Sequence, residues 1–317
     1  MVGGGASGWN RRPARLPARA RPPGRRARLS LKKIHLLPNL LTLANAFCGV
    51  LAVCKAVDAL VAGDKDPELF YSLMSTATWL VFLGMLFDAL DGKVARMVGA
   101  SSSFGAQLDS FSDLLTFGLA PALLAKVLVE HEAALLGLSI NHRVSFVCAM
   151  LYVAMAILRL ARFNLENDPD PEAHRHFKGL PSPGAAGAVA STILLYLTLR
   201  KPALEQADGL RTPFGDLLGL WPGLRDERVL SWMLFGLLAL VVAAALLMVS
   251  RVRYRHMTSA LTERGQFFTL VGVAAAAIVL WMAPVPALFL VFVGYALFGI
   301  GGAARRRAQS FSEARAP

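Results

Sequence analysis

The sequence predicts an all-α membrane protein, a polytopic bundle of about eight transmembrane helices. Of the 317 residues, 55% are hydrophobic and only 17% are charged. Soluble domains are less apolar and carry more charge, at about 45–50% and about 25% of residues. Apolar runs that approach or exceed about 18 residues recur along the chain, and each is long enough to cross a bilayer. Short connections between them indicate a single membrane domain.

The expected spans follow the apolar runs in order. They lie near residues 39–62, 70–90, 107–130, 144–163, 184–199, 229–250, 267–283 and 285–301. The third is polar at its start and carries Pro121, and the fifth is short. Two further segments flank them: a disordered basic tail over 1–31, and a basic tail over 304–317. The tail over 1–31 has too few apolar residues to build a core.

The distribution of basic residues predicts the orientation. Residues 1–37 carry ten of the Lys and Arg residues and no acidic residue. By the positive-inside rule this end is cytoplasmic, and eight spans return the C-terminus to the same side of an inner membrane. The loop over 200–228 breaks the pattern because it holds five basic residues. We interpret the first tail as a topology anchor that contacts anionic lipid, with no nucleic-acid partner.

Four aspartates lie close together in "DALDGKVARMVGASSSFGAQLDSFSD", residues 88–113. Asp88 and Asp91 are three residues apart, and Asp109 and Asp113 are four apart. Each pair therefore shares one face of a helix. A short turn between the two helices would make them antiparallel, and we expect the two faces to converge.

Four facing carboxylates repel one another unless cations lie between them. All-oxygen sites suit Mg²⁺ or Mn²⁺, and two such ions can serve a phosphoryl displacement. Gly92, Ala95 and Gly105 are small enough for a phosphate to approach the backbone, and Arg96 can pair with it. Two alternatives remain open at this point: solvated charges at helix ends, and a cation-transport site, which normally lies nearer the middle of the membrane.

The spacing resembles a known signature. Asp88-x-x-Asp91-Gly92-x-x-Ala95-Arg96, eight residues, then Gly105-x-x-x-Asp109-x-x-x-Asp113 resembles the motif of CDP-alcohol phosphatidyltransferases at every fixed position. The resemblance implies a catalytic unit formed by the first six spans, usually a homodimer, and two metal ions held by Asp88, Asp91, Asp109 and Asp113. It makes Asp113 the base. It also implies CDP contacts from Asn39 and Thr42 in "LLPNLLTLANAFCG", and from Asp88, Gly92, Ala95, Arg96 and Gly105.

Other stretches point to a branch of this family. "RLARFN", "FKGLPSPGAA" and "SRVRYR" resemble phosphatidylserine synthases, so the implied substrates are CDP-diacylglycerol and L-serine in a lipid bilayer. Serine is a zwitterion, and Arg159, Arg162 and Lys178 are candidates to bind its carboxylate. The resemblance covers about 32–256, and 257–303 would add two helices. The competing hypotheses are the same transfer to another alcohol (glycerol 3-phosphate, inositol or choline), a cation-coupled transporter, and a non-catalytic scaffold that binds anionic lipid.

Overall fold

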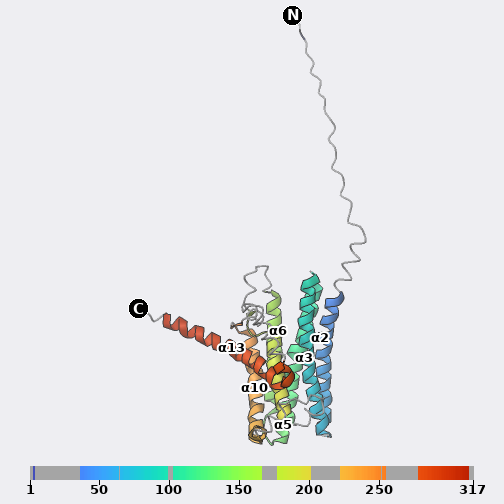
Figure 1. Ribbon diagram of the computed structural model, residues 1–317, viewed down its shortest axis with the longest axis vertical. Helices are drawn as coiled ribbons and strands as arrows, with labels where there is room; N and C mark the ends of the chain where they lie inside the picture. Colours follow the sequence, from blue (N-terminus) through green and yellow to red (C-terminus); the bar gives the residue numbers. More distant parts are fainter. Residues whose placement is uncertain are drawn as a thin grey trace.

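Long helices make up almost all of the chain that the computed structural model describes, which is residues 3, 36–63, 65–98, 103–165, 177–200, 222–250, 252–254 and 278–313. Within these residues, seven helices are long and apolar enough to cross a membrane. Most of them stand side by side as a bundle (Figure 1). The predicted all-α membrane fold is therefore confirmed.

The first six predicted spans correspond to helices with similar bounds. In chain order the elements are α2 (Leu36–Ala62), α3 (Pro67–Val98), α4 (Ser103–Asp113), the π-helix η1 (Leu114–Leu119), α5 (Ala120–Leu135), α6 (His142–Leu165), the strand β1 (Phe177–Lys178), α7 (Ser182–Arg200), the 3-10 helix η3 (Pro222–Arg225), α10 (Glu227–Val249), the strand β2 (Arg253–Tyr254) and α13 (Pro284–Glu313). The third predicted span is longer than expected, because α4, η1 and α5 together form one candidate membrane span over Phe104–Leu135.

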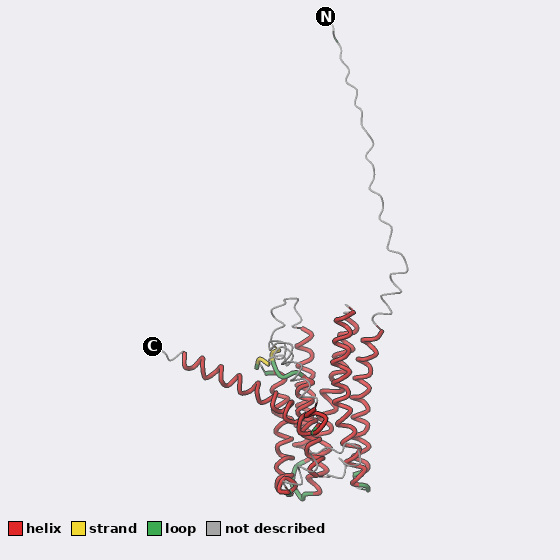
Figure 2. The backbone as a smooth tube through the Cα atoms, viewed as in Figure 1, coloured by secondary structure: helices red, strands yellow, loops and turns green. Residues whose placement is uncertain are grey.

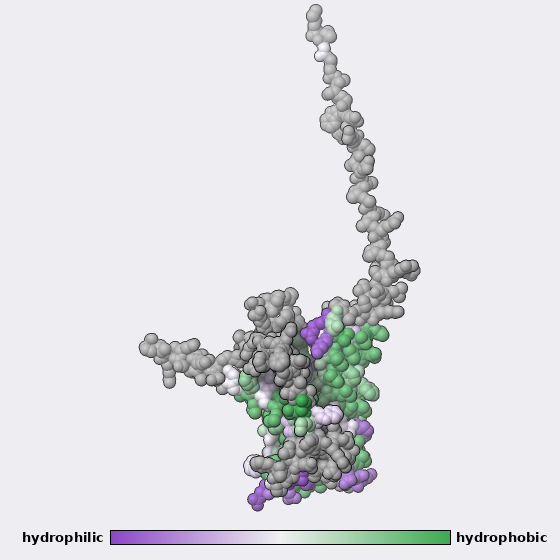
Figure 3. Space-filling model, viewed as in Figure 1, coloured by the Kyte–Doolittle hydropathy of each residue, from purple (hydrophilic) through white to green (hydrophobic). Residues whose placement is uncertain are grey.

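The outer surface of the bundle is apolar. Leu40, Phe47 and Val57 on α2 are about half exposed or more, as are many other large apolar side chains of the outer helices. Figure 3 shows apolar residues gathered over the flank of the bundle and hydrophilic residues towards both of its ends. A contiguous apolar surface of this extent needs lipid or another apolar partner as its solvent.

One of the two shortest spans, α7, is the most enclosed. In the apolar 18-residue stretch of α7, 89% of the residues are buried inside the bundle, whereas the corresponding share is 33% in α2, α3 and α10. Its sequence "SPGAAGAVAS" is rich in small residues, which let neighbouring helices approach closely in lipid. The short fifth span is therefore the central helix of the bundle, and α3, α5, α10 and α13 pack around it.

The C-terminal region differs from the prediction. The expected seventh span, 267–283, lies mostly outside the described residues. Residues 278–282 are helical, Ala283 interrupts the helix, and α13 begins at Pro284, close to the boundary expected between the seventh and eighth spans. Two hydrogen bonds bridge this break: Ala283 N donates to Val279 O (2.9 Å) and Ala287 N to Ala283 O (3.1 Å). The basic segment after residue 303 continues α13 as far as Glu313, consistent with its Ala, Arg and Gln residues, which favour helix. The predicted disordered tail over 1–31 lies outside the described residues, apart from Gly3.

A buried carboxylate joins three helices at one end of the bundle. Glu132 on α5 is 0% exposed and accepts hydrogen bonds from the hydroxyl groups of Tyr71 on α3 and Tyr196 on α7. Arg200 Nε, at the end of α7, donates to Glu132 Oε2 at 3.0 Å. The carboxylate therefore has charge compensation and several hydrogen bonds, which a buried ion requires.

Replacing Glu132 with leucine should lower the free energy of unfolding by about 3–5 kcal/mol, because it leaves Arg200 and both tyrosine hydroxyls without their shared acceptor. The measurement is thermal or denaturant unfolding of the purified protein in detergent. Glu68→Gln, an exposed change on the first turn of α3, is the matched control. A Glu132→Leu variant as stable as this control would show that the network contributes nothing to stability.

Candidate active site

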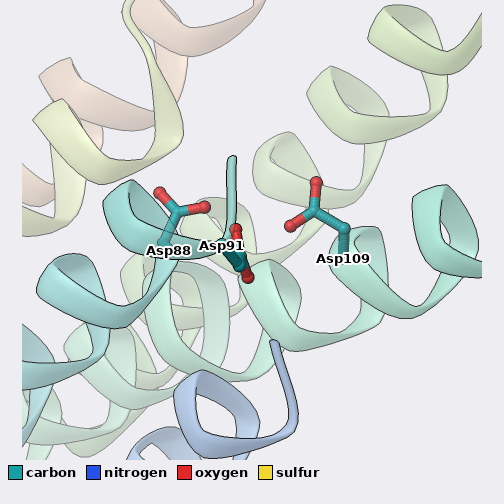
Figure 4. A group of neighbouring side chains, drawn as sticks. All are labelled: Asp88, Asp91 and Asp109. Atoms are coloured by element: carbon teal, nitrogen blue, oxygen red, sulfur yellow. The ribbon is translucent and has the colours of Figure 1, made fainter. Parts of the chain in front are cut away.

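Three aspartates converge from two helices. Asp88 and Asp91 lie on adjacent turns near the end of α3, and Asp109 lies on α4. One carboxylate oxygen of each lies within 4.8 Å of those of the other two. In Figure 4, Asp91 lies between Asp88 and Asp109. Only four residues separate α3 from α4 in the sequence, and the two charged faces lie together, as their spacing predicts.

The burial of these carboxylates fits a bound cation. Asp91 is only 5% exposed, although carboxylates are rarely buried without a partner. Asp91 Oδ2 and Asp109 Oδ1 are buried and have no hydrogen-bond partner among the described residues. Like charges at this separation in a half-buried site repel strongly. Two orphaned acceptor oxygens beside a third carboxylate are the donor set that a hard divalent cation prefers.

Asp113 lies one turn beyond Asp109, at the end of α4, and is not among the three most closely grouped carboxylates. It lies within electrostatic range of Asp88, Asp109 and Asp91. The amide group of Asn45, on α2, donates through Nδ2 to Asp113 Oδ1 at 3.3 Å. One oxygen of Asp113 is thereby held by the protein scaffold, and the orientation of its carboxylate is fixed.

Asn45 is a site residue that the sequence prediction missed. It lies in "LLPNLLTLANAFCG", the stretch from which only Asn39 and Thr42 were selected. Asn45 is fully buried, and its backbone carbonyl accepts a hydrogen bond from Thr116 Oγ1 (2.9 Å). A polar side chain on a lipid-spanning helix is costly without partners, and that cost is the signal that could have identified it.

The π-helix η1 directly follows Asp113 and fits tightly against two helices. Single-turn π segments are often found at functional sites. A Cβ atom on Gly49 of α2 would lie 2.5 Å from Thr116 Oγ1, and one on Gly84 of α3 would lie 2.5 Å from Thr116 Cγ2. Larger residues at these positions would push η1 away from α2 and α3. The close packing therefore fixes the position of Asp113 along the bundle axis relative to Asp88 and Asp91.

The residues predicted to contact CDP lie on α2, α3 and α4, and one of them lies beside an aspartate of the group. The hydroxyl group of Thr42 lies beside the carboxylate of Asp91. A Cβ atom on Gly92 would have no described atom within 4 Å, so the backbone there faces open space. Arg96 is exposed and donates through Nε to the Gly92 carbonyl at 2.9 Å. Asn39, Ala95 and Gly105 are half-buried on α2, α3 and α4.

The three predicted acceptor residues are placed differently. Arg159 on α6 is 8% exposed, lies within electrostatic range of Asp113, and donates through Nη1 to Met248 O at 3.1 Å. Arg162 is half-buried on the next turn of α6. Lys178 lies on β1, paired with Arg253 of β2 at one end of the bundle (Figure 2), and its side chain is outside the described part. The structure thus brings Arg159 toward the aspartates.

Comparison with known proteins gives a consistent result. A family model described as CDP-alcohol phosphatidyltransferase matches residues 35–213. The chain is 32% identical over 168 residues to a CDP-diacylglycerol–serine O-phosphatidyltransferase of Helicobacter pylori (strain ATCC 700392 / 26695). The aligned region covers 53% of this chain and 61% of the relative. It therefore spans about three fifths of that relative's length.

Two other relatives carry the same name. The match to the protein of Bacillus subtilis (strain 168) is 33% identical over 152 residues, 48% of this chain and 72% of the relative. The match to the protein of Methanocaldococcus jannaschii is 33% identical over 157 residues, 50% of this chain and 60% of the relative. These similarities do not support the hypothesis of a cation-coupled transporter.

Proposed function

Because the chain belongs to the CDP-alcohol phosphatidyltransferase family, we propose that it transfers the phosphatidyl group of CDP-diacylglycerol to L-serine, giving phosphatidylserine and CMP. The observation that carries the proposal is the convergence of Asp88, Asp91 and Asp109, with two buried orphaned oxygens, beside Asp113. The names of the relatives, CDP-diacylglycerol–serine O-phosphatidyltransferases, support serine as the acceptor.

The four aspartates have two roles in this proposal. Asp88, Asp91, Asp109 and Asp113 would hold two divalent ions, Mg²⁺ or Mn²⁺, which would neutralise the pyrophosphate and favour departure of CMP. Asp113 also takes the proton of the serine hydroxyl as that oxygen bonds to the phosphorus and the bond from phosphorus to CMP breaks. Asn45 donates to Asp113 Oδ1, which directs the remaining oxygen to the proton.

The surrounding residues bind the two substrates. Thr42, beside Asp91, and the open backbone at Gly92 suit the CDP group, as do Asn39, Ala95, Arg96 and Gly105. For serine, the buried guanidinium of Arg159 is a good partner of a carboxylate because arginine presents several donors in one plane. Arg162 and Lys178 complete the acceptor set in this proposal.

The orientation of the site follows from the first six spans. The basic N-terminal segment is expected on the cytoplasmic side of the inner membrane. The end of α3, the start of α4 and the end of α6 then lie on that same side, because successive spans alternate in direction. The side of the C-terminus depends on residues 255–277, which lie outside the described part, and we keep the expectation that it is cytoplasmic.

A homodimer remains part of the proposal.

The test is release of CMP from CDP-diacylglycerol by the purified protein in Mg²⁺ or Mn²⁺, with a panel of acceptors. Serine should give turnover at least about tenfold above inositol and choline, which carry no anion to pair with Arg159, since a charged group that loses its buried partner costs more than about 1.4 kcal/mol. Glycerol 3-phosphate carries an anionic phosphate and is therefore the stricter competitor. Faster release with another alcohol would reassign the acceptor. No release with any alcohol would contradict the enzymatic function itself.

A further inference from the structure

The chain just before α7 is attached to the end of α10 by backbone hydrogen bonds. Strand β1 pairs antiparallel with β2, which follows α10. Beyond the strand, Gly179 N donates to Val252 O at 2.8 Å, and Leu180 N donates to Leu247 O at 3.0 Å. Leu180 is fully buried. We call residues 177–180 the clasp, because they join the α6–α7 connection to α10 along their whole length.

The clasp lies against the buried side chain of Arg159 on α6. Arg159 is 8% exposed, and its Nη1 donates to Met248 O in the last turn of α10 at 3.1 Å. Carbonyl groups in the last turn of a helix lack partners within the helix and carry partial negative charge, so a guanidinium group is a favourable partner for them. A Cβ atom on Gly179 would lie 2.3 Å from Met248 O and 3.0 Å from Arg159 Nη1. Gly179 therefore contacts both members of this hydrogen bond.

Gly179 is the residue type that this junction requires. Its φ is +91°, a backbone conformation that residues with a Cβ atom rarely adopt. The hydrogen bonds of the clasp hold the backbone on both sides of the glycine, so a side chain here could not move away without breaking them. The end of α10 or the guanidinium of Arg159 would have to shift instead. Glycine therefore leaves the hydrogen bond between Arg159 and Met248 intact.

Two contacts place this part of α6 alongside the segment that carries the proposed base. On one side of Arg159, the Cβ atom of Ala156 lies 3.2 Å from the position that a Cβ atom on Gly118 would occupy. On the other side, Asn164 Nδ2 donates to Ser110 Oγ at 3.0 Å. The same number of residues separates the two contacts on each segment, so α6 runs antiparallel to α4 and η1. Arg159 and the proposed base therefore lie within about one helical turn of each other along the bundle axis.

A long, buried arginine binds an anion well only when its rotamers are restricted beforehand, because ordering such a side chain costs free energy at the moment of binding. We propose that Gly179 is a positioning residue whose left-handed backbone keeps Arg159 anchored to the end of α10, where its guanidinium binds the acceptor's carboxylate. The proposal rests on the proposed function. It makes recognition of the acceptor depend on the junction of α6, the clasp and α10.

The test is the kinetics of Gly179→Ala. The KM for serine should rise about 5–10-fold, the cost of restricting one flexible side chain again on binding. The KM for CDP-diacylglycerol and kcat should stay within about twofold of the parent protein, since the aspartates are untouched. Gly137→Ala is the matched control, because Gly137, between α5 and α6, also has a left-handed backbone, with φ +65°, but a Cβ atom there would meet nothing within 4 Å. It should change neither KM.

Two further variants separate displacement of the arginine from backbone strain. Asparagine tolerates a left-handed backbone better than alanine but still carries a Cβ atom, so Gly179→Asn should give the same rise in the KM for serine. In an Arg159→Gln background, Gly179→Ala should add less than about twofold to this KM, because residues that act through one contact are not additive.

Four outcomes would overturn the proposal while leaving the enzymatic function intact. They are an unchanged serine KM in Gly179→Ala, an equal rise in the KM for CDP-diacylglycerol, full additivity with Arg159→Gln, and failure of both Gly179 variants to fold when Gly137→Ala folds. The last would make the junction purely structural. Absence of CMP release by the unsubstituted protein with every acceptor would contradict the proposed function and this inference with it.

Discussion

Replacing Asp113 with asparagine should lower CMP release at saturating serine by about 10²–10⁴-fold, the usual contribution of a positioned general base. Asparagine preserves the shape of the side chain and one acceptor oxygen, but it has no negative charge and cannot take a proton at neutral pH. Asp88, Asp91 and Asp109, the three most closely grouped carboxylates, remain in place. Metal-dependent binding of CDP-diacylglycerol should therefore persist while turnover falls.

The measurement pairs binding of CDP-diacylglycerol with single-turnover release of CMP. Asp58→Asn is the matched control, since Asp58 is 57% exposed on α2 and pairs with Lys55 at 3.5 Å. It should leave both properties unchanged. Turnover of Asp113→Asn close to that of the parent protein would show that another group accepts the proton. Loss of substrate binding together with turnover would instead make Asp113 mainly a metal ligand.

Removing the divalent cation should abolish turnover, and replacing Asp91 with asparagine should raise the Mg²⁺ concentration for half-maximal activity by about 10²-fold or more. Asp91 is the most enclosed of the three grouped carboxylates, so its attraction to a cation is the least screened by water. A factor of 100 in the Mg²⁺ concentration corresponds to about 2.7 kcal/mol. This is a modest share of the attraction between a buried carboxylate and a divalent cation.

Thermal stability gives a readout that does not depend on activity. A cation that binds only the folded protein stabilises it, so Mg²⁺ should raise the Tm of the parent protein. At the same Mg²⁺ concentration the shift should be lost in Asp91→Asn. In EDTA the variant should be at least as stable as the parent, because one of three repelling charges is gone. Full turnover in EDTA, or an equal Mg²⁺-dependent shift in both proteins, would contradict the metal site.

The sequence by itself determined the class of the fold and the core of the site. Runs of apolar residues fix helices in lipid, because every backbone polar group must be paired within its own segment. The spacing of Asp88 and Asp91 placed both on one face of α3 through helical periodicity alone. The short connection to α4 then made it possible to expect Asp109 beside them. These are local relations, and they depend only on residues near one another in the chain.

The tertiary structure alone decided which distant residues complete the site. Asn45 reaches Asp113 across 68 residues, and Arg159 donates to the carbonyl of Met248 across 89 residues. In lipid most of the surface of a spanning helix is apolar, so hydropathy indicates few of the faces that meet. That choice depends on close contact at small residues, such as Phe292 against Gly187, and on polar groups that find partners on other helices. Such contacts exist only once the whole bundle has assembled.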